Sequence, residues 1–180
     1  MTRILATLAL TALTACGSTQ YFAPPPLQSE LRVNARANTV MINEVTIPEY
    51  AINQEIPIQQ ADGSLTTDTD RLWADLPDRA LANAITRHLN TITDADVAVE
   101  PWPLSGFPDV EVSIRVEDMI VQADGRLRFT GAYALRPETG RGSVDSFALF
   151  APVNGDSFVE IIAAHEAVWL LLAEELARKL

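Results

Sequence analysis

The sequence predicts an α/β sandwich, in which two helices cover a mixed, largely antiparallel sheet. Residues 110–135 alternate apolar and polar side chains on both sides of an Asp-Gly pair, which is the pattern of two half-buried strands joined by a tight turn. Residues 72–93 and 157–179 instead repeat apolar side chains at helical spacing. With no internal repeat, this order predicts a single domain over residues 38–180.

The first half of the domain combines short strands with the first helix. Residues 39–47 are rich in β-branched side chains and end before Pro48, which predicts a strand. An Asp-Gly turn within residues 54–67 predicts a peripheral hairpin. In the helical segment 72–93, Pro77 suits the first helical position, because the N–H group that proline lacks would have no partner there.

The second half adds further strands and ends with the second helix. Residues 97–99 predict a short strand, and the hairpin at 110–135 is followed by a third long strand at 144–153. The Phe-Ala-Leu-Phe run in this third strand is apolar enough to predict burial on both faces. Ser157 and Glu160 have the spacing of a capping box, so we expect the last helix to begin beside Ser157.

The amino-terminal segment indicates export and lipid anchoring. Residues 4–13 are mostly apolar and follow Arg3, but a membrane span needs about 20 such residues, so they suit a secretory signal peptide. The sequence Leu-Thr-Ala-Cys that ends at Cys16 resembles the lipobox of bacterial lipoproteins, in which the cysteine is acylated after cleavage on its amino side. Residues 1–15 are then the signal peptide. The alternative is an ordinary signal peptide cleaved after Ala15, which leaves a free thiol.

Residues 16–37 are expected to comprise the lipidated cysteine and a tether. Three consecutive prolines at 24–26 favour extended polyproline II, and fourteen residues of such a chain span roughly 45 Å. Tyr21 and Phe22 are too apolar for a free linker, so we expect them to dock on the domain or on a partner. Gly17 stands where lipoproteins retained at the inner membrane carry aspartate, so this resemblance implies the outer membrane.

Composition and motifs give little support to catalysis or to nucleic-acid binding. The 24 Asp and Glu residues outnumber the 13 Lys and Arg residues, and the resulting acidic surface opposes binding to nucleic acid. The sequence has no cysteine pair, phosphate-binding loop or nucleophile elbow, so we expect no metal and no other cofactor. His88 and His165 lie singly in the helical segments, where a packed structural role is the simpler interpretation. An enzyme that uses these histidines is the least supported hypothesis.

Three aromatic side chains are candidates for binding a partner protein. Trp73 stands at the start of the first helical segment, and Trp102 and Phe107 lie in the proline-rich loop 101–108. A docking surface needs exposed apolar or aromatic side chains. The alternative for Trp73 is packing at a corner of the fold, and for the two loop residues it is packing in the core.

Two motifs carry a resemblance to a known family. The corner Val-Thr-Ile-Pro-Glu-Tyr-Ala at residues 45–51, the helix start Arg-Leu-Trp-Ala-Asp-Leu-Pro at 71–77 and its continuation at 80–85 resemble the ABC-type transport auxiliary lipoprotein family. The resemblance covers residues 40–175. The sequence departs from it at the prolines 24–26, where family members often have an opening strand of Tyr-Tyr-Leu type.

The resemblance implies a lipid-anchored, non-enzymatic subunit of an ABC/MCE-type lipid transport system. The fold that it implies is a three-layer α/β sandwich similar to anticodon-binding domains. Its implied partners are an MCE-domain channel protein with an inner-membrane permease and ATPase, and further copies of the chain in a ring. In this role the subunit docks the periplasmic channel at the outer membrane and supports membrane integrity. The alternative function is a periplasmic lipid carrier whose apolar cavity accepts an acyl chain.

Overall fold

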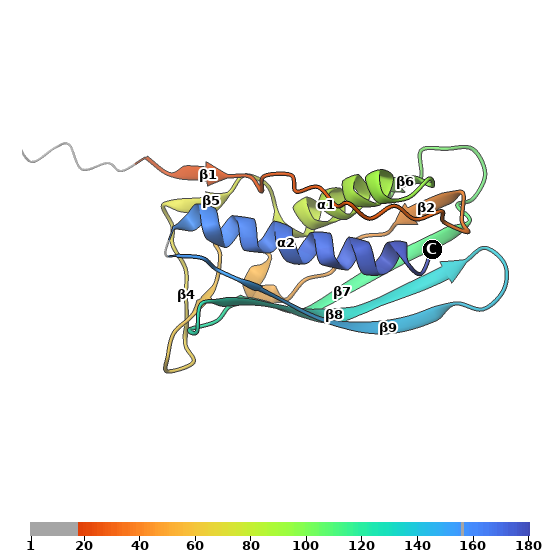
Figure 1. Ribbon diagram of the computed structural model, residues 1–180. Coiled ribbons are helices and arrows are strands. Elements are labelled where there is room, and N and C mark those ends of the chain that lie inside the picture. Colours follow the sequence, from red (N-terminus) through yellow and green to blue (C-terminus); the bar gives the residue numbers. More distant parts are fainter. Residues whose placement is uncertain (1–17, 156) are drawn as a thin grey trace, which may run out of the picture.

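A computed structural model describes the chain except for residues 1–17 and 156. Its helices are α1 (Pro77–Ile92) and α2 (Phe158–Ala177), and a short 3-10 turn, η1, covers Glu49–Ala51. The strands are β1 (Gln20–Phe22), β2 (Thr39–Ile42), β3 (Ile58–Gln59), β4 (Leu65–Thr66), β5 (Arg71–Trp73), β6 (Asp96–Val99), β7 (Val110–Val121), β8 (Arg126–Pro137) and β9 (Ser143–Pro152). Both helices lie on one side of the main sheet (Figure 1), which confirms the predicted α/β sandwich.

The main sheet is mixed, as predicted. Strands β7, β8 and β9 are antiparallel neighbours, and the turn between β7 and β8 contains Gly125 in the left-handed conformation, with φ of 78°. Strand β2 lies parallel between β6 and β7, while β3 pairs in parallel with the far end of β7. The hairpin expected within residues 54–67 is confirmed as the pair β3–β4.

Strand β9 differs from its prediction. It pairs with β8, and among the described strands it has no second neighbour, so it forms an edge of the sheet. Only one of its faces is covered: Phe147 is buried, whereas Phe150 is exposed and Val144 has 75% of its surface exposed. The apolar run therefore predicted burial on both faces wrongly, because the run contains residues of both faces and only one is packed against α2.

The two helices begin at the residues that local chemistry favours. Helix α1 starts with Pro77 after Leu76 in an extended conformation, as expected for a residue before proline. Residues 72 and 73, which the sequence pattern included in the helix, instead belong to β5, and this strand pairs in parallel with β1. Helix α2 has the predicted capping box, in which Ser157 and Glu160 bind each other's backbone N–H groups.

Residues 23–38, here called the strap, lie against the helices. The segment that was expected to be a free tether is therefore part of the folded domain from Gln20 onward. The backbone N–H of Leu27 donates a hydrogen bond to the side chain of Glu166 at 3.4 Å. The hydroxyl of Ser29 donates to Glu174 at 2.5 Å, and Ser29 is buried. Both acceptors belong to α2, so the strap follows this helix along its length (Figure 1).

The strap packs because its second half is apolar at every second position. Its side chains that contact the core are Leu31, Val33, Ala35 and Ala37. This alternation is typical of an extended chain with one buried face. Val33 forms a parallel bridge with Thr93 at the end of α1. Phe22, just before the strap, packs its ring on Phe158 at 4.8 Å, which confirms that it docks on the domain.

A buried carboxylate connects α1, α2 and the strap. Glu166 of α2 has no exposed surface, and its Oε1 atom accepts hydrogen bonds from Arg87 at 2.7 Å and from His88 at 3.0 Å. Its third donor is Leu27 of the strap. Burial raises the pKa of Glu166, but the hydrogen bonds from His88 and Arg87 outweigh this effect and lower the pKa overall.

An aromatic cluster forms the core beneath β5. The rings of Trp73 and Trp169 stack with centroids 5.4 Å apart, and His165 meets Trp73 edge-on at 5.0 Å. The Nδ1 atom of His165 donates to the carbonyl of Ile161 at 2.8 Å. Burial lowers the pKa of His165 to about 4, so its imidazole is neutral at pH 7.

We predict that Glu166→Ala lowers the free energy of unfolding by about 3 kcal/mol, because it leaves His88 buried without its partner. Urea unfolding followed by tryptophan fluorescence measures the change. The matched control is Glu117→Ala, at an exposed position of β7, which should stay within about 0.5 kcal/mol of the parent. Equal losses for the two variants would contradict a structural role of Glu166.

A second prediction concerns pH. The His165 imidazole takes up a proton near pH 6.5 in the unfolded chain but only near pH 4 in the folded one, so the unfolded state binds the proton first. Stability should therefore decrease as the pH falls from 6.5 to 4, by up to about 3 kcal/mol from this group. Urea titrations across this range should show a smaller decrease for His165→Leu. The same decrease in both proteins would assign the pH dependence to other groups.

Candidate partner-binding surface

The loop between β6 and β7, residues 100–109, exposes a pair of large apolar side chains. Phe107 has 81% of its surface exposed, the highest value among the large hydrophobic residues that the structure describes, and Leu104 is also exposed. Trp102 is half-buried, and its Nε1 atom is buried without a hydrogen-bond partner among the described residues. Gly106 takes a left-handed conformation, with φ of 80°, which only glycine adopts without strain.

The base of this loop is fixed while its tip projects. The carboxylate of Asp109 accepts hydrogen bonds from the backbone N–H groups of Asn38 at 2.7 Å and Thr39 at 3.1 Å. These bonds hold the pKa of Asp109 below its usual range, so the group stays ionised. The loop lies at the end of the molecule opposite to β1 (Figure 1). The two ends therefore differ: one receives the chain from its amino terminus, and the other presents Phe107.

The structure does not bring the three candidate aromatic residues together. Trp73 belongs to β5 near the end that carries β1, and only 1% of its surface is exposed. Trp73 is therefore packed inside the fold rather than available to a partner, because Trp169 and His165 cover its ring. Trp102 and Phe107 lie at the opposite end. Cys16 lies outside the described residues.

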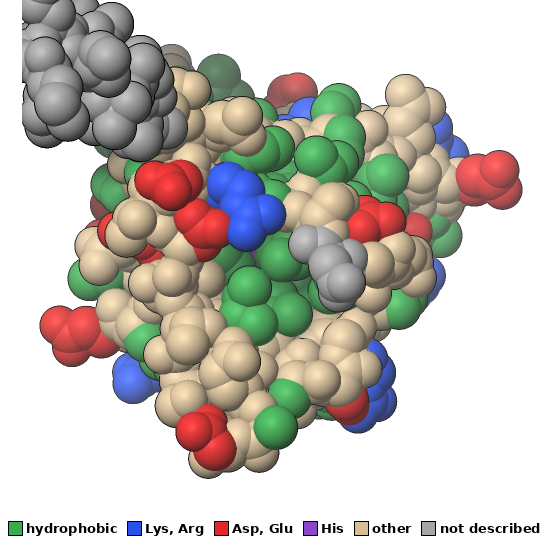
Figure 2. Space-filling view, turned by 90° about the vertical axis from the view of Figure 1, so that its left-hand side faces the viewer, with side chains coloured by type: hydrophobic (Ala, Val, Ile, Leu, Met, Phe, Trp, Pro, Cys, Tyr) green, Lys and Arg blue, Asp and Glu red, His purple; other side chains and the backbone are tan. Residues whose placement is uncertain are grey.

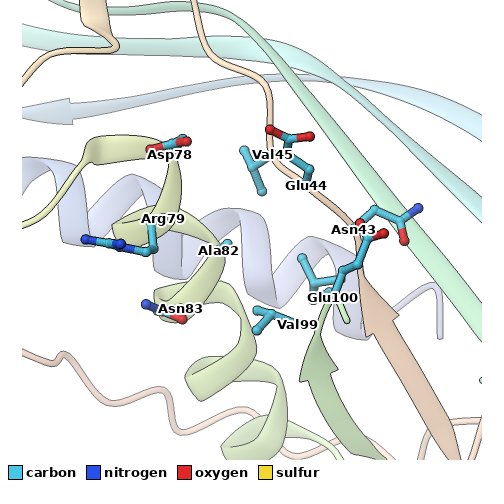
Figure 3. Close-up of a pocket in the computed structure, with 10 residues that line it drawn as sticks. Asn43, Glu44, Val45, Asp78, Arg79, Ala82, Asn83, Val99 and Glu100 are labelled. Atoms are coloured by element: carbon cyan, nitrogen blue, oxygen red, sulfur yellow. The ribbon is translucent and has the colours of Figure 1, made fainter. Parts of the chain in front are cut away.

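A cleft of about 470 Å³, lined by both apolar and charged side chains, opens beside α1, next to the segment after β2 and the end of β6 (Figure 3). Its charged lining residues are Glu44, Asp78, Arg79 and Glu100. Arg79 already pairs with Asp75 one helical turn earlier, which leaves the carboxylates in excess. No histidine, cysteine or hydroxyl side chain is among the described residues that line it, so the cleft offers polar contacts rather than a nucleophile. Sequence reasoning missed this cleft because its three segments share no motif.

Neither a metal centre nor a membrane span is present in the described part of the chain. None of its groups of His, Cys, Asp and Glu side chains could hold a metal ion. Neither described helix is sufficiently long and apolar to cross a bilayer.

Comparisons with known proteins find similar sequences and similar folds. The intermembrane transport lipoprotein PqiC of Escherichia coli is 25% identical over all of this chain and 98% of its own length. The crystal structure of an uncharacterised protein superposes with a TM-score of 0.74 at 20% identity, covering 90% of this chain and 98% of that protein. Protein XCC0632 from Xanthomonas campestris superposes with a TM-score of 0.66 at 15% identity, covering 88% and 92%.

The two structural matches show a shared fold. The sequence match is more specific, because residues 22–177 match the description "ABC-type transport auxiliary lipoprotein component". The match begins at the end of β1 and includes the strap, both helices and the whole main sheet. The chain therefore belongs to the family of ABC-type transport auxiliary lipoproteins.

Proposed function

We propose that this protein is a lipid-anchored, non-enzymatic subunit of an MCE-type lipid transport system, which docks the periplasmic channel protein at the outer membrane. The observation that carries the proposal is the position of the exposed loop 100–109 at the end opposite to β1. In this arrangement an anchor on Cys16 holds one end of the domain at the membrane. The other end then presents Phe107 and Leu104 to the periplasm.

The chemistry of the loop suits protein docking. Interface cores are rich in aromatic side chains and poor in charge, and a few of these residues supply most of the binding energy. Phe107 and Leu104 are exposed, while the fixed base at Asp109 limits the loss of chain entropy on binding. The MCE-domain protein is the proposed partner at this loop. The permease, the ATPase and further copies of the chain in a ring complete the proposed assembly.

We predict that Phe107→Ala weakens binding to the proposed MCE-domain partner at least tenfold, because it removes an exposed aromatic anchor. The matched control is Val144→Ala, which removes a similarly accessible apolar group from the edge strand β9. Titration of the purified lipoprotein with the MCE-domain protein measures both affinities. Unchanged binding by Phe107→Ala, or equal losses in the two variants, would reject the loop as the docking site.

Anchoring has its own test. Cys16→Ala should yield a folded protein that is soluble in the periplasm but fails to restore detergent resistance to a strain that lacks the gene, because the acyl chains are missing. Cell fractionation and growth on detergent measure the two effects. Full complementation by this variant would contradict the anchored role.

A further inference from the structure

The end of the domain that carries β1 has little freedom to leave the membrane. This step rests on the anchor at Cys16 from the proposed function. Strand β1 is held in place by two backbone hydrogen bonds of 2.7 Å. The N–H of Gln20 donates to the carbonyl of Asp70, and the N–H of Ala74 donates to the carbonyl of Phe22. An extended chain covers at most about 3.6 Å per residue, so the four steps from Cys16 to Gln20 span at most roughly 14 Å. The end face around β1 therefore lies against the bilayer.

This end face contains a hollow of about 400 Å³. It opens beside the hairpin β3–β4, the turn between β7 and β8, the end of β9 and the first turns of α2. Figure 2 views the molecule from this end and shows hydrophobic side chains gathered in a recess near the middle of the face. The side chains that matter here are Ile58, Val121, Val153 and Ile161, with Gln59 and Gln122 beside them. Its volume lies within the range of about 300–1,000 Å³ that is typical of small-molecule sites.

The chemistry of the hollow suits an uncharged, flexible chain. Among the described residues, its lining carries no charged side chain. The side-chain oxygen of Gln122 is buried without a hydrogen-bond partner among those residues, which leaves an acceptor for a donor group. Two carboxylates, Asp62 and Asp124, stand in the adjoining turns. The nearby Arg126 is paired with Asp124 rather than free for a phosphate.

We propose that this hollow binds one acyl chain of a phospholipid from the bilayer that holds the anchor. The apolar walls receive the chain, and the acceptors at the mouth favour a headgroup with donor groups, such as ethanolamine. The acyl chains on Cys16 are the other source within reach. They are the less favourable occupant, because stable anchoring requires them to remain in the bilayer. The hollow would then hold a lipid at the membrane surface, at the end of the domain opposite to the loop 100–109.

Photo-crosslinking tests the proposal. The full lipidated chain is placed in phosphatidylethanolamine vesicles that contain a phospholipid with a diazirine at the end of one acyl chain. After irradiation, mass spectrometry should find most crosslinks in the peptides that contain residues 58–61, 121–125 and 153–161. Val153→Glu and Ile58→Glu, which place a charge in the hollow, should each lower this yield at least fivefold. Leu65→Glu, at an exposed position of β4 outside the lining, should leave it unchanged.

Three outcomes would overturn the proposal. Crosslinks spread over the whole surface, or a yield that neither hollow variant lowers, would mean that the hollow is not an acyl site. A yield in the hollow that appears in detergent micelles only after Cys16→Ala would assign the site to the protein's own acyl chains. The same probe in detergent micelles reaches the hollow without an anchor. If the protein binds neither vesicles nor the channel protein, the proposed function fails. Crosslinking of the hollow in micelles would then still support the acyl site by itself.

Discussion

One buried carboxylate joins three parts of the fold that lie far apart in the sequence. Helices α1 and α2 and the strap meet at Glu166, which accepts from Arg87, His88 and the backbone of Leu27. A buried charge needs hydrogen bonds to replace its lost hydration, and here all three donors reach Oε1, whereas Oε2 is buried without a partner among the described residues. The position of the strap thus depends on the packing of the two helices. The point where the chain enters the domain is fixed separately, by the pairing of β1 with β5.

The two ends of the molecule differ, and in the proposed function one faces the membrane and the other faces the partner. At the end with β1 and β5, the stacked side chains of Trp73 and Trp169 are buried in the core. The opposite end presents Phe107 on a loop with a fixed base. The strap runs between the two ends along the helices (Figure 1). A rigid body with distinct ends suits a subunit that links a bilayer to a protein channel.

Local patterns predicted the long elements well, because each has a strong signal within its own sequence. The hairpin β7–β8 follows from alternation and an Asp-Gly turn, and α2 follows from a capping box and an apolar repeat. Strands β1 and β5 were missed, since three-residue strands have no period of their own and form through pairing with distant segments. The prolines at 24–26 suggested a free tether, but the alternating side chains after them pack on the helices. Of the candidate aromatic residues, Trp73 could not be assigned from sequence, because its burial depends on Trp169, nearly a hundred residues away.

Strand β9 has a consequence for how copies of this protein meet in solution. Its outer edge presents a row of backbone N–H and C=O groups over ten residues, and such a row is a template for pairing with another strand. The strand itself has one charged side chain, Asp145, which is paired with Lys179. Charges on the strand therefore do little to prevent its edge from pairing with a strand of another molecule. Protection comes instead from the net charge of −11 on the whole chain, which makes copies repel one another at a distance. Salt screens this repulsion within about 10 Å at 0.1 M, so the colloidal stability of the protein depends on ionic strength as well as on its fold.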